Sequence, residues 1–446
     1  MTAPAPSFCA IDFGTSNSAI AIPNQGGSGM QLVPLEGPHL TMPTAVFYCT
    51  DTSDLPPGVL REASTGPQPD LWRCFGRAAV RAYIEGYEGR LMRSMKSILG
   101  TALVEQTTEL GNGSGVRYID IITGYLRHLR TLAEARHGAP LNHVVLGRPV
   151  YFVDDDPARD AQAQASLQQA ARAVGFADVA FQFEPIAAAF DFEQHATREQ
   201  IVLVADIGGG TSDFSVVRVG PERAQRIERR DDILASHGVH IAGTDFDRRV
   251  SLASIMPLLG HGTMGVAQAG EMALPISSRI YIDLATWHLI NTLYQPARVA
   301  EVRALQPVYA NPVHHQRLLK VLTARLGHAL AGQAEAAKIA VAEGHDGSLD
   351  LTLLERDLHA ELDATHTEQA LHDDIDRIVA CAQDTVRQAG LQAQQIDALY
   401  FTGGSTGLTL LTDRLQAAFA TATPVRGDRL ASVATGLGLH AARLFG

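Results

Sequence analysis

The stretch IVLVADIGGGTSDFSVVRV, residues 201–219, decides how the rest of the sequence is interpreted. A run of aliphatic residues ends at Asp206, three glycines follow, and the alternation of apolar and polar residues resumes after Thr211. Two strands joined by a short turn that contains glycine are typical of a β-hairpin. Glycines at its tip allow backbone N–H groups to approach an anion, because no Cβ is in the way.

Residues 7–22, SFCAIDFGTSNSAIAI, have the same outline, with Asp12 at the end of the first strand. A recurrence at such a distance indicates two related domains rather than short repeats. The first turn taken alone is explained equally well as an ordinary hairpin corner. The pair of turns, together with a third glycine turn, FTGGSTG at residues 401–407, favours a shared role.

Two such hairpins facing each other would hold a polyphosphate from both sides. Asp12 and Asp206 would be repelled by that phosphate unless a cation lies between, so they imply Mg²⁺ held through its waters. The sequence contains no GxxxxGK[ST] motif, since none of its three lysines follows a glycine. The predicted phosphate site is therefore not a P-loop.

The composition excludes several classes of protein. The chain has 446 residues, too many for one compact core, and 46% of them are hydrophobic. A net charge of −12 argues against a general binder of nucleic acid or of anionic membranes. The four scattered cysteines, the lack of a signal-like N-terminus and the lack of a long apolar run predict a soluble, cytoplasmic protein.

The remaining sequence alternates strands and helices. Residues 120–138 and 157–176 have helical spacing and helix punctuation, and residues 143–152 are typical of a buried strand that runs into a loop. Residues 245–345 are predicted to be mostly helical, and residues 349–354 to form a short strand. This alternation indicates an α/β architecture.

Taken together, these motifs resemble the actin-like ATPase superfamily and, within it, the heat shock protein 70 family. AIDFGTSNS and VADIGGGTSDFSV are similar to the two phosphate loops of that family, and FTGGSTG to its adenosine loop. Further similar segments are FEPIAAA (183–189), HIAGTDFD (240–247), LMRSMKSILG (91–100) and GQAEAAKIA (332–340). The resemblance extends over nearly the whole chain in order.

The resemblance implies an α/β, two-lobed actin-like ATPase fold, a duplicated ribonuclease H-like domain with helical insertions. Lobe I would comprise residues 1–198 and be completed by residues 428–446. Lobe II would comprise residues 199–427 and include a helical subdomain at about 245–345. ATP or ADP with Mg²⁺ would lie in the cleft between the lobes.

The resemblance also assigns roles to residues. Lys96 would hold the terminal phosphate and the attacking water, so the implied catalytic set is Lys96, Asp206, Glu184 and Thr211. The metal would be held, through water, by Asp12, Asp206 and Glu184. The implied nucleotide-binding residues are Asp12, Gly14, Thr15, Ser16, Gly208, Gly209, Gly210, Thr211, Gly243, Glu335, Lys338, Gly403, Gly404 and Ser405. Asp213 would either orient a water or cap its own turn.

The sequence departs from the family pattern at the base site. Ile339 and Gly407 replace two family arginines, and Leu430 replaces a carboxylate before the last helix. Without an arginine to stack on it, the base would be bound more weakly or in a differently shaped site. Residues 250–330 match poorly, and the peptide-binding domain is absent, as in the short, YegD-like members of the family. Trp72 and Trp287 are explained more simply by packing than by recognition.

We therefore expect a chaperone-type, slowly hydrolysing ATPase that is monomeric and has no peptide clamp of its own. Its partners would be the nucleotide and a client or co-chaperone protein, with no nucleic acid and no membrane. Two alternatives stay open at this point: an actin-like filament-forming ATPase, and a small-molecule kinase of the same superfamily. Lys96 in its segment favours the chaperone over the filament, and the EPIAAA and AGTDFD segments argue against the kinase.

Overall fold

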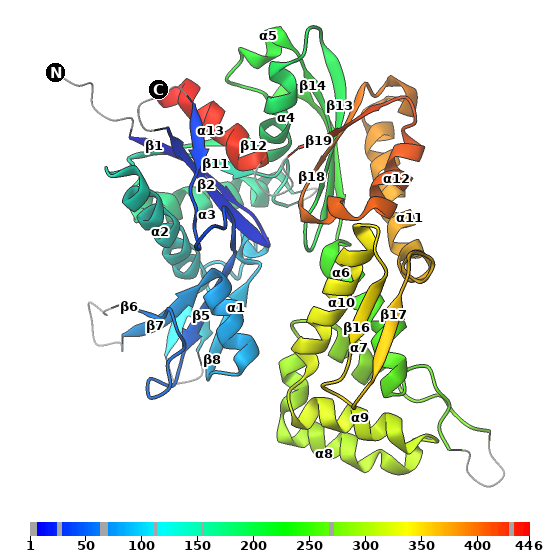
Figure 1. The fold of residues 1–446 in the computed structure, drawn as a ribbon. Coiled ribbons are helices and arrows are strands. Elements are labelled where there is room, and N and C mark those ends of the chain that lie inside the picture. Colours follow the sequence, from blue (N-terminus) through cyan, green and yellow to red (C-terminus); the bar gives the residue numbers. More distant parts are fainter. Residues whose placement is uncertain are drawn as a thin grey trace.

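The fold is described from a computed structural model. It describes residues 7–24, 29–62, 70–110, 114–153, 156–266, 272–427 and 432–446. Figure 1 shows two parts side by side, each built around a large sheet. We call the elements from β1 to α4, together with α13, the N-terminal half, and the elements from β13 to β19 the C-terminal half.

The large sheet of the N-terminal half has the strand order β12-β11-β1-β2-β3, with β4 paired to β2. β1 and β2 are antiparallel and form the first predicted hairpin, whereas β1 and β11 are parallel. The strands are β1 (Phe8–Phe13), β2 (Asn17–Pro23), β3 (Met30–Leu32), β4 (Met42–Pro43), β11 (His143–Arg148) and β12 (Asp178–Phe183). The register pairs Asp12 with Ala19 and so places Asp12 one residue from the end of β1.

Helices α2 (Tyr118–His137) and α3 (Pro157–Val174) pack on each other and contribute to a core with this sheet. A smaller sheet, of order β6-β7-β5-β8, extends the N-terminal half downward in Figure 1 and is covered by α1. Its elements are β5 (Ala45–Cys49), β6 (Leu60–Glu62), β7 (Leu71–Phe75), α1 (Gly76–Glu85) and β8 (Gly89–Arg93). The short 3₁₀ helix Met95–Ile98 follows, then the hairpin of β9 (Thr107–Glu109) and β10 (Gly115–Arg117).

The large sheet of the C-terminal half has the strand order β15-β14-β13-β18-β19. β13 pairs antiparallel with β14, which forms the second predicted hairpin, and parallel with β18. The elements are β13 (Gln200–Ile207), β14 (Ser212–Val219), α5 (Pro221–Ala224), β15 (Ile233–Val239), α11 (Ala364–Gln388), β18 (Ala398–Thr402), α12 (Thr409–Ala418) and β19 (Thr423–Arg426). α11 packs against β14 and β15.

The predicted helical region lies below this sheet in Figure 1. It comprises α6 (Gly243–Val250), α7 (Arg279–Ala285), α8 (Pro296–Ala304), α9 (Pro312–Thr323) and α10 (Gly327–Ala342). The predicted strand at 349–354 is wrong in its bounds: β16 (Gly347–Asp350) pairs with β17 (His359–Leu362), and residues 352–354 form a turn. Leu351 and Leu354 are buried because this turn packs into the core of the C-terminal half.

Helices α4 (Glu184–Gln194) and α13 (Ser432–Phe445) connect the two halves. They pack against each other, and their apolar side chains share one core with residues of both large sheets. α13 lies against β1, β2 and β11, although it is far from them in sequence. The actin-like α/β fold is thus confirmed, while the lobe boundaries at residues 198 and 427 stay predictions. No helix among the described residues is long and apolar enough to span a membrane.

Candidate functional site

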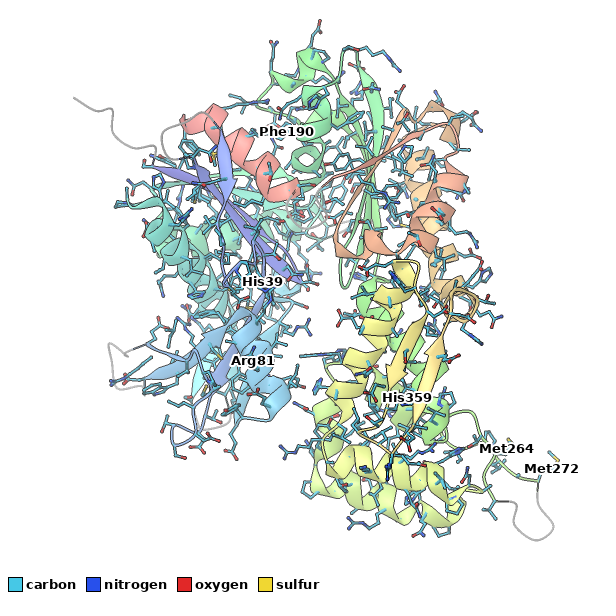
Figure 2. The ribbon with its side chains drawn as sticks, in the orientation of Figure 1. His39, Arg81, Phe190, Met264, Met272 and His359 are labelled. Carbon is cyan, nitrogen blue, oxygen red and sulfur yellow. The ribbon has the colours of Figure 1, made fainter. Side chains whose placement is uncertain are left out.

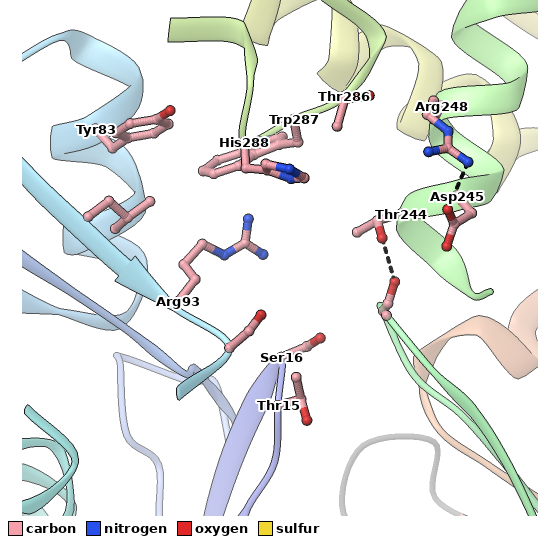
Figure 3. Close-up of a pocket in the computed structure, with 14 residues that line it drawn as sticks. Thr15, Ser16, Tyr83, Arg93, Thr244, Asp245, Arg248, Thr286, Trp287 and His288 are labelled. Carbon is pink, nitrogen blue, oxygen red and sulfur yellow. Dashed lines mark hydrogen bonds and ion pairs between the residues drawn. The ribbon is translucent and has the colours of Figure 1, made fainter. Parts of the chain in front are cut away.

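The tips of the two hairpins adjoin each other, and both line one cavity of about 520 Å³. A Cβ added to Gly209 would lie 2.8 Å from Oγ of Ser16, which belongs to the opposite tip. Thr15 and Ser16 of the first tip (Figure 3) and Gly209 and Gly210 of the second tip all line the cavity. The residues predicted to form two phosphate loops are therefore brought together at one place.

The first tip is braced by a residue that sequence reasoning did not find. Thr44, which follows β4, donates from its Oγ1 to the carbonyl of Gly14 at 2.7 Å and from its N–H to the carbonyl of Ser16 at 2.9 Å. Its hydroxyl also lies 2.8 Å from that of Ser18. Thr44 is buried, and these bonds fix the turn from behind.

The second tip is held by its carbonyl groups. The Oγ of Ser405 donates to the carbonyl of Gly208 at 2.6 Å, and the N–H of Gly243 donates to the same carbonyl at 3.2 Å. Thr244 donates to the carbonyl of Gly209 from both its N–H and its hydroxyl, at 2.8 and 2.7 Å. Within the described part of the chain, nothing accepts a hydrogen bond from the N–H groups of Gly209 and Gly210. The braced turn therefore keeps free donors on the side of the cavity, as an anion site requires.

Carboxylates gather below the two tips. The register pairs Asp206 with Asp213 on β14 and with Thr402 on β18. Lys96 and Glu184 are ion-paired, with 2.5 Å between Nζ and Oε1, and both side chains are largely buried. Burial acts to lower the pKa of Lys96, but the charges of Glu184 and Asp12 outweigh it and leave the pKa raised. Lys96 is therefore a buried, permanently charged ammonium at neutral pH.

The electrostatics of the aspartates fit a cation. Burial raises the pKa of Asp12 to about 7, and the charge of Glu184 adds to this, while Lys96 opposes it. Burial also raises the pKa of Asp206 to about 8, and the charges of Asp213, Glu184 and Asp12 act in the same direction. One ammonium is thus too little positive charge for these carboxylates, and a divalent cation would stabilise their ionised forms.

The described residues contain no group of three or more His, Cys, Asp or Glu side chains close enough to ligate a metal directly. Mg²⁺ keeps several of its waters when it binds a protein, so a site of this kind needs carboxylates within reach of the water shell rather than in direct contact. The charge of Glu184 raises the pKa of both Asp12 and Asp206, so these three carboxylates are the candidates for such a site. Thr211 donates to Asp213 at 2.8 Å, which favours the interpretation of Asp213 as a cap of its own turn.

The residues predicted around the nucleoside lie next to the second tip. Gly403 has a φ of 88°, and a Cβ there would lie 2.7 Å from Oδ1 of Asp206, so only glycine fits the turn. Gly404 is exposed. α10 packs on α6 and carries Glu335, which is exposed, and Lys338, which is ion-paired to Asp247 at 2.6 Å.

Burial raises the pKa of this Asp247 to about 6, although Lys338 opposes the shift. Lys338 is thus already neutralised by a carboxylate of α6. Ile339, at the position of the family's stacking arginine, is 46% exposed, so it offers an apolar surface there. Leu430 lies outside the described residues.

Residues 8–253 match the model of the family described as Hsp70 protein, which is more than half of the chain. The chain belongs to the Hsp70 family. It corresponds to the nucleotide-binding domain of an Hsp70-like chaperone, and membership of the Hsp70 family does not favour the filament or kinase alternatives.

The chain is similar to two kinds of curated Hsp70 relative. It is 30% identical over 241 residues to the chaperone protein HscA homolog of Actinobacillus pleuropneumoniae serotype 5b, which covers 53% of this chain and 36% of the relative. It is 23% identical over 423 residues to the chaperone protein DnaK of Burkholderia cenocepacia, which covers 92% of this chain and 54% of the relative. The chain thus matches about a third to a half of the length of these relatives.

Other cavity-lining residues also escaped prediction. Thr244 follows Gly243 within the segment HIAGTDFD. Because Gly243 was a predicted site residue, its position next to Thr244 is a signal that could have identified Thr244. Arg93 and Trp287 also line the cavity, from β8 and from the segment after α7. They are far apart in sequence, and no local pattern connects them. Trp287, for which packing was the simpler explanation, does pack against Tyr83, and it also borders the cavity.

Proposed function

We propose that the chain binds Mg·ATP and Mg·ADP in the cleft and hydrolyses ATP slowly to ADP and phosphate. The observation that carries this proposal is the pair of adjoining glycine tips that line one cavity with free N–H donors, next to the buried Lys96. Backbone donors and an ammonium act mainly by positioning phosphoryl oxygens and stabilising their charge.

Each group has a defined task in this proposal. The N–H groups of Gly209 and Gly210 and the hydroxyls of Thr15 and Ser16 donate to phosphate oxygens. Lys96, which Glu184 orients, holds the terminal phosphate and the attacking water as a compact ammonium. When bound near the carboxylates, Mg²⁺ would neutralise charge on the phosphate oxygens.

We further propose that the nucleotide state is signalled to a client or co-chaperone protein through movement of the two halves. α4 begins at Glu184, directly at the site, and packs on α13 in the core that both large sheets share. A displacement of Glu184 on nucleotide binding is therefore transmitted to the contact between the halves. We also propose that the protein is cytoplasmic. The roles given above to the individual site residues are proposals as well.

Isothermal titration calorimetry with ATP, ADP and GTP, with and without Mg²⁺, tests the nucleotide site. We expect metal-dependent binding of ATP and ADP, and we expect Asp206→Asn to weaken it at least tenfold, since the substitution removes one carboxylate of the metal site. Asp346→Asn, at an exposed position outside the cleft, is the matched control. Equal affinity with and without metal would contradict the role of Asp206.

Turnover measurements on Lys96→Ala test the catalytic assignment separately. We expect this variant to keep nucleotide binding within a few-fold and to lose hydrolysis, because the ammonium acts on the terminal phosphate and the water. A phosphate-release assay under single-turnover conditions gives the rate. Undiminished hydrolysis would remove Lys96 from the mechanism.

A further inference from the structure

The cavity also contains a positively charged side chain that the proposed function does not use. Arg93, the last residue of β8, projects its guanidinium into the cavity (Figure 3). The guanidinium carbon lies 4.3 Å from the centroid of the Trp287 ring. Throughout the described ranges no carboxylate forms an ion pair with Arg93, although the charge of Glu335 acts on it from a greater distance. The Arg93 residue is exposed, and with no ion-pair partner among the described residues its in-plane N–H groups are available to a ligand.

The two residues come from different halves of the molecule. Arg93 belongs to the small sheet of the N-terminal half, and Trp287 follows α7 in the C-terminal half. The Tyr83 ring of α1 lies 5.2 Å from the Trp287 ring, and Nδ2 of Asn291 donates to the carbonyl of Tyr83 at 3.3 Å. We call the Trp287 ring, on which Arg93 stacks, the platform. It lies beside Arg93 only while the two halves are in contact, as they are in this structure.

The chemistry of Arg93 suits a phosphoryl group. A guanidinium that stacks on an aromatic ring uses one of its faces for that contact. Its N–H donors lie in the plane of the group and remain free to donate two parallel hydrogen bonds to one phosphate. The hydroxyl-bearing residues Ser94, Thr286 and Ser16 line the same cavity. Ser94 has a φ of 54°, which is uncommon for serine, and this turn separates Arg93 from the buried Lys96.

We propose that Arg93, stacked on Trp287, binds a phosphoryl group in the cleft and is a positioning residue that couples its presence to contact between the halves. The group is either the terminal phosphate of the nucleotide or the inorganic phosphate released from it. This inference rests on the proposed nucleotide function. Because the platform needs both halves, a ligand that binds Arg93 there favours the closed arrangement, and closure in turn tightens its binding.

Trp287 itself provides the readout, since the chain has only one other tryptophan, Trp72. In a Trp72→Phe background, tryptophan emission reports on Trp287 and on the cation stacked over it. The emission is titrated with Mg·ATP, with Mg·ADP, and with inorganic phosphate in the presence of saturating Mg·ADP. A response to Mg·ATP alone assigns the site to the terminal phosphate of the nucleotide. A response to phosphate added after Mg·ADP assigns it to released phosphate.

In the same background, we expect Arg93→Gln to abolish the change in Trp287 emission. We also expect it to weaken binding of the ligand that causes this change, Mg·ATP or phosphate, about tenfold, because one charge-assisted contact is lost. Arg93→Lys keeps the charge but not the planar fork, and we expect it to restore only part of the response. Arg81→Gln, an exposed arginine on α1 outside the cavity (Figure 2), is the matched control and should behave like the parent.

The outcomes separate this inference from the proposed function. If calorimetry shows that Mg·ATP does not bind at all, the nucleotide function itself is wrong. If Mg·ATP binds normally while Trp287 responds to neither ligand, the subsite alone is overturned. A response that persists unchanged in Arg93→Gln also overturns it, because the emission then follows closure without Arg93.

Discussion

The substitution Gly436→Ala tests whether the close approach of α13 to α4 holds the two halves in register. Gly436 lies in the interior of α13, and a Cβ there would lie 2.6 Å from the carbonyl carbon of Ala187 in α4, and closer still to its oxygen. Ordinary contact begins at 3.4 Å. The helices must therefore separate by more than 0.8 Å, the difference between these two distances, because the carbonyl oxygen lies closer than the carbon. Backbone atoms offer no flexible end that could move aside.

Overpacking of this kind costs about 1–3 kcal/mol. Replacing glycine by alanine inside a helix by itself stabilises the folded state by about 0.5–1 kcal/mol. We therefore expect a net loss of about 1–2 kcal/mol in the free energy of unfolding. Glu184 lies one turn before Ala187 on the same helix, so the displacement also disturbs its 2.5 Å contact with Lys96. Nucleotide affinity should fall together with stability.

Gly438→Ala is the matched control, because it adds the same methyl group to the same helix. Its Cβ would lie 3.1 Å from Cγ of Met30 and 3.2 Å from Cβ of Ala21, and the flexible Met30 side chain can move away. We expect this variant to unfold within about 0.5 kcal/mol of the parent. Thermal and urea unfolding of both variants, followed by circular dichroism, give the comparison. If Gly436→Ala proves as stable as Gly438→Ala, the argument from the helix contact is refuted.

Three further predictions follow from buried polar groups. The pKa of Asp206 is about 8 in the folded protein, whereas its ordinary value is 3.8. Between pH 3.8 and 8 the metal-free folded state therefore binds more protons than the unfolded state. Its stability should therefore fall as pH rises from about 4 to 8, and Asp206→Asn should flatten this part of the melting-temperature profile. Thr44→Val removes the hydrogen bond to Gly14, and we expect a loss of about 1–2 kcal/mol in urea unfolding, with Thr44→Ser largely restored. Arg229→Met leaves the buried carboxylate of Glu193 without its ion-pair partner and leaves Asp232 paired with Arg223 alone. It should cost about 3–5 kcal/mol by the same measurement, whereas Arg226→Met at the exposed surface should be neutral.

Each of these predictions has a contradicting result. A pH profile of Asp206→Asn that runs parallel to the parent would show that this carboxyl is ionised in the metal-free protein. Equal stability of the valine and serine variants at Thr44 would mean that the hydroxyl does not brace the turn. A fully stable Arg229→Met would imply that its carboxylate partners lose their charge or reach water.

The hairpins could be predicted from the sequence because their signals are local. Alternation of apolar residues before Asp12 and Asp206, followed by glycines, specifies two strands and a turn without reference to the rest of the chain. The order of motifs then indicated the family, and with it the positions of Lys96 and Glu184. The structure adds that these two side chains are bonded to each other.

The remainder of the site could not be predicted because it depends on contacts between distant segments. Thr44 holds Gly14 from the bend between β4 and β5, and no pattern in the sequence around residue 44 predicts that contact. Arg93 meets Trp287 only because the two halves close over one cavity. The bounds of β16 were missed for a similar reason, since the leucines after Asp350 are buried by a turn rather than by strand pairing.

The position of α13 has a consequence for how the protein is made. This helix is packed against β1, the first strand of the described residues, and against its neighbours β2 and β11. A ribosome produces β1 early and α13 only after the large sheet of the C-terminal half. Until then, the face of β1, β2 and β11 that α13 covers is exposed to solvent. Contacts between such remote segments slow folding and leave apolar surface exposed in the meantime. During its synthesis, this relative of chaperones should therefore itself be prone to aggregate until Ser432–Phe445 has been translated.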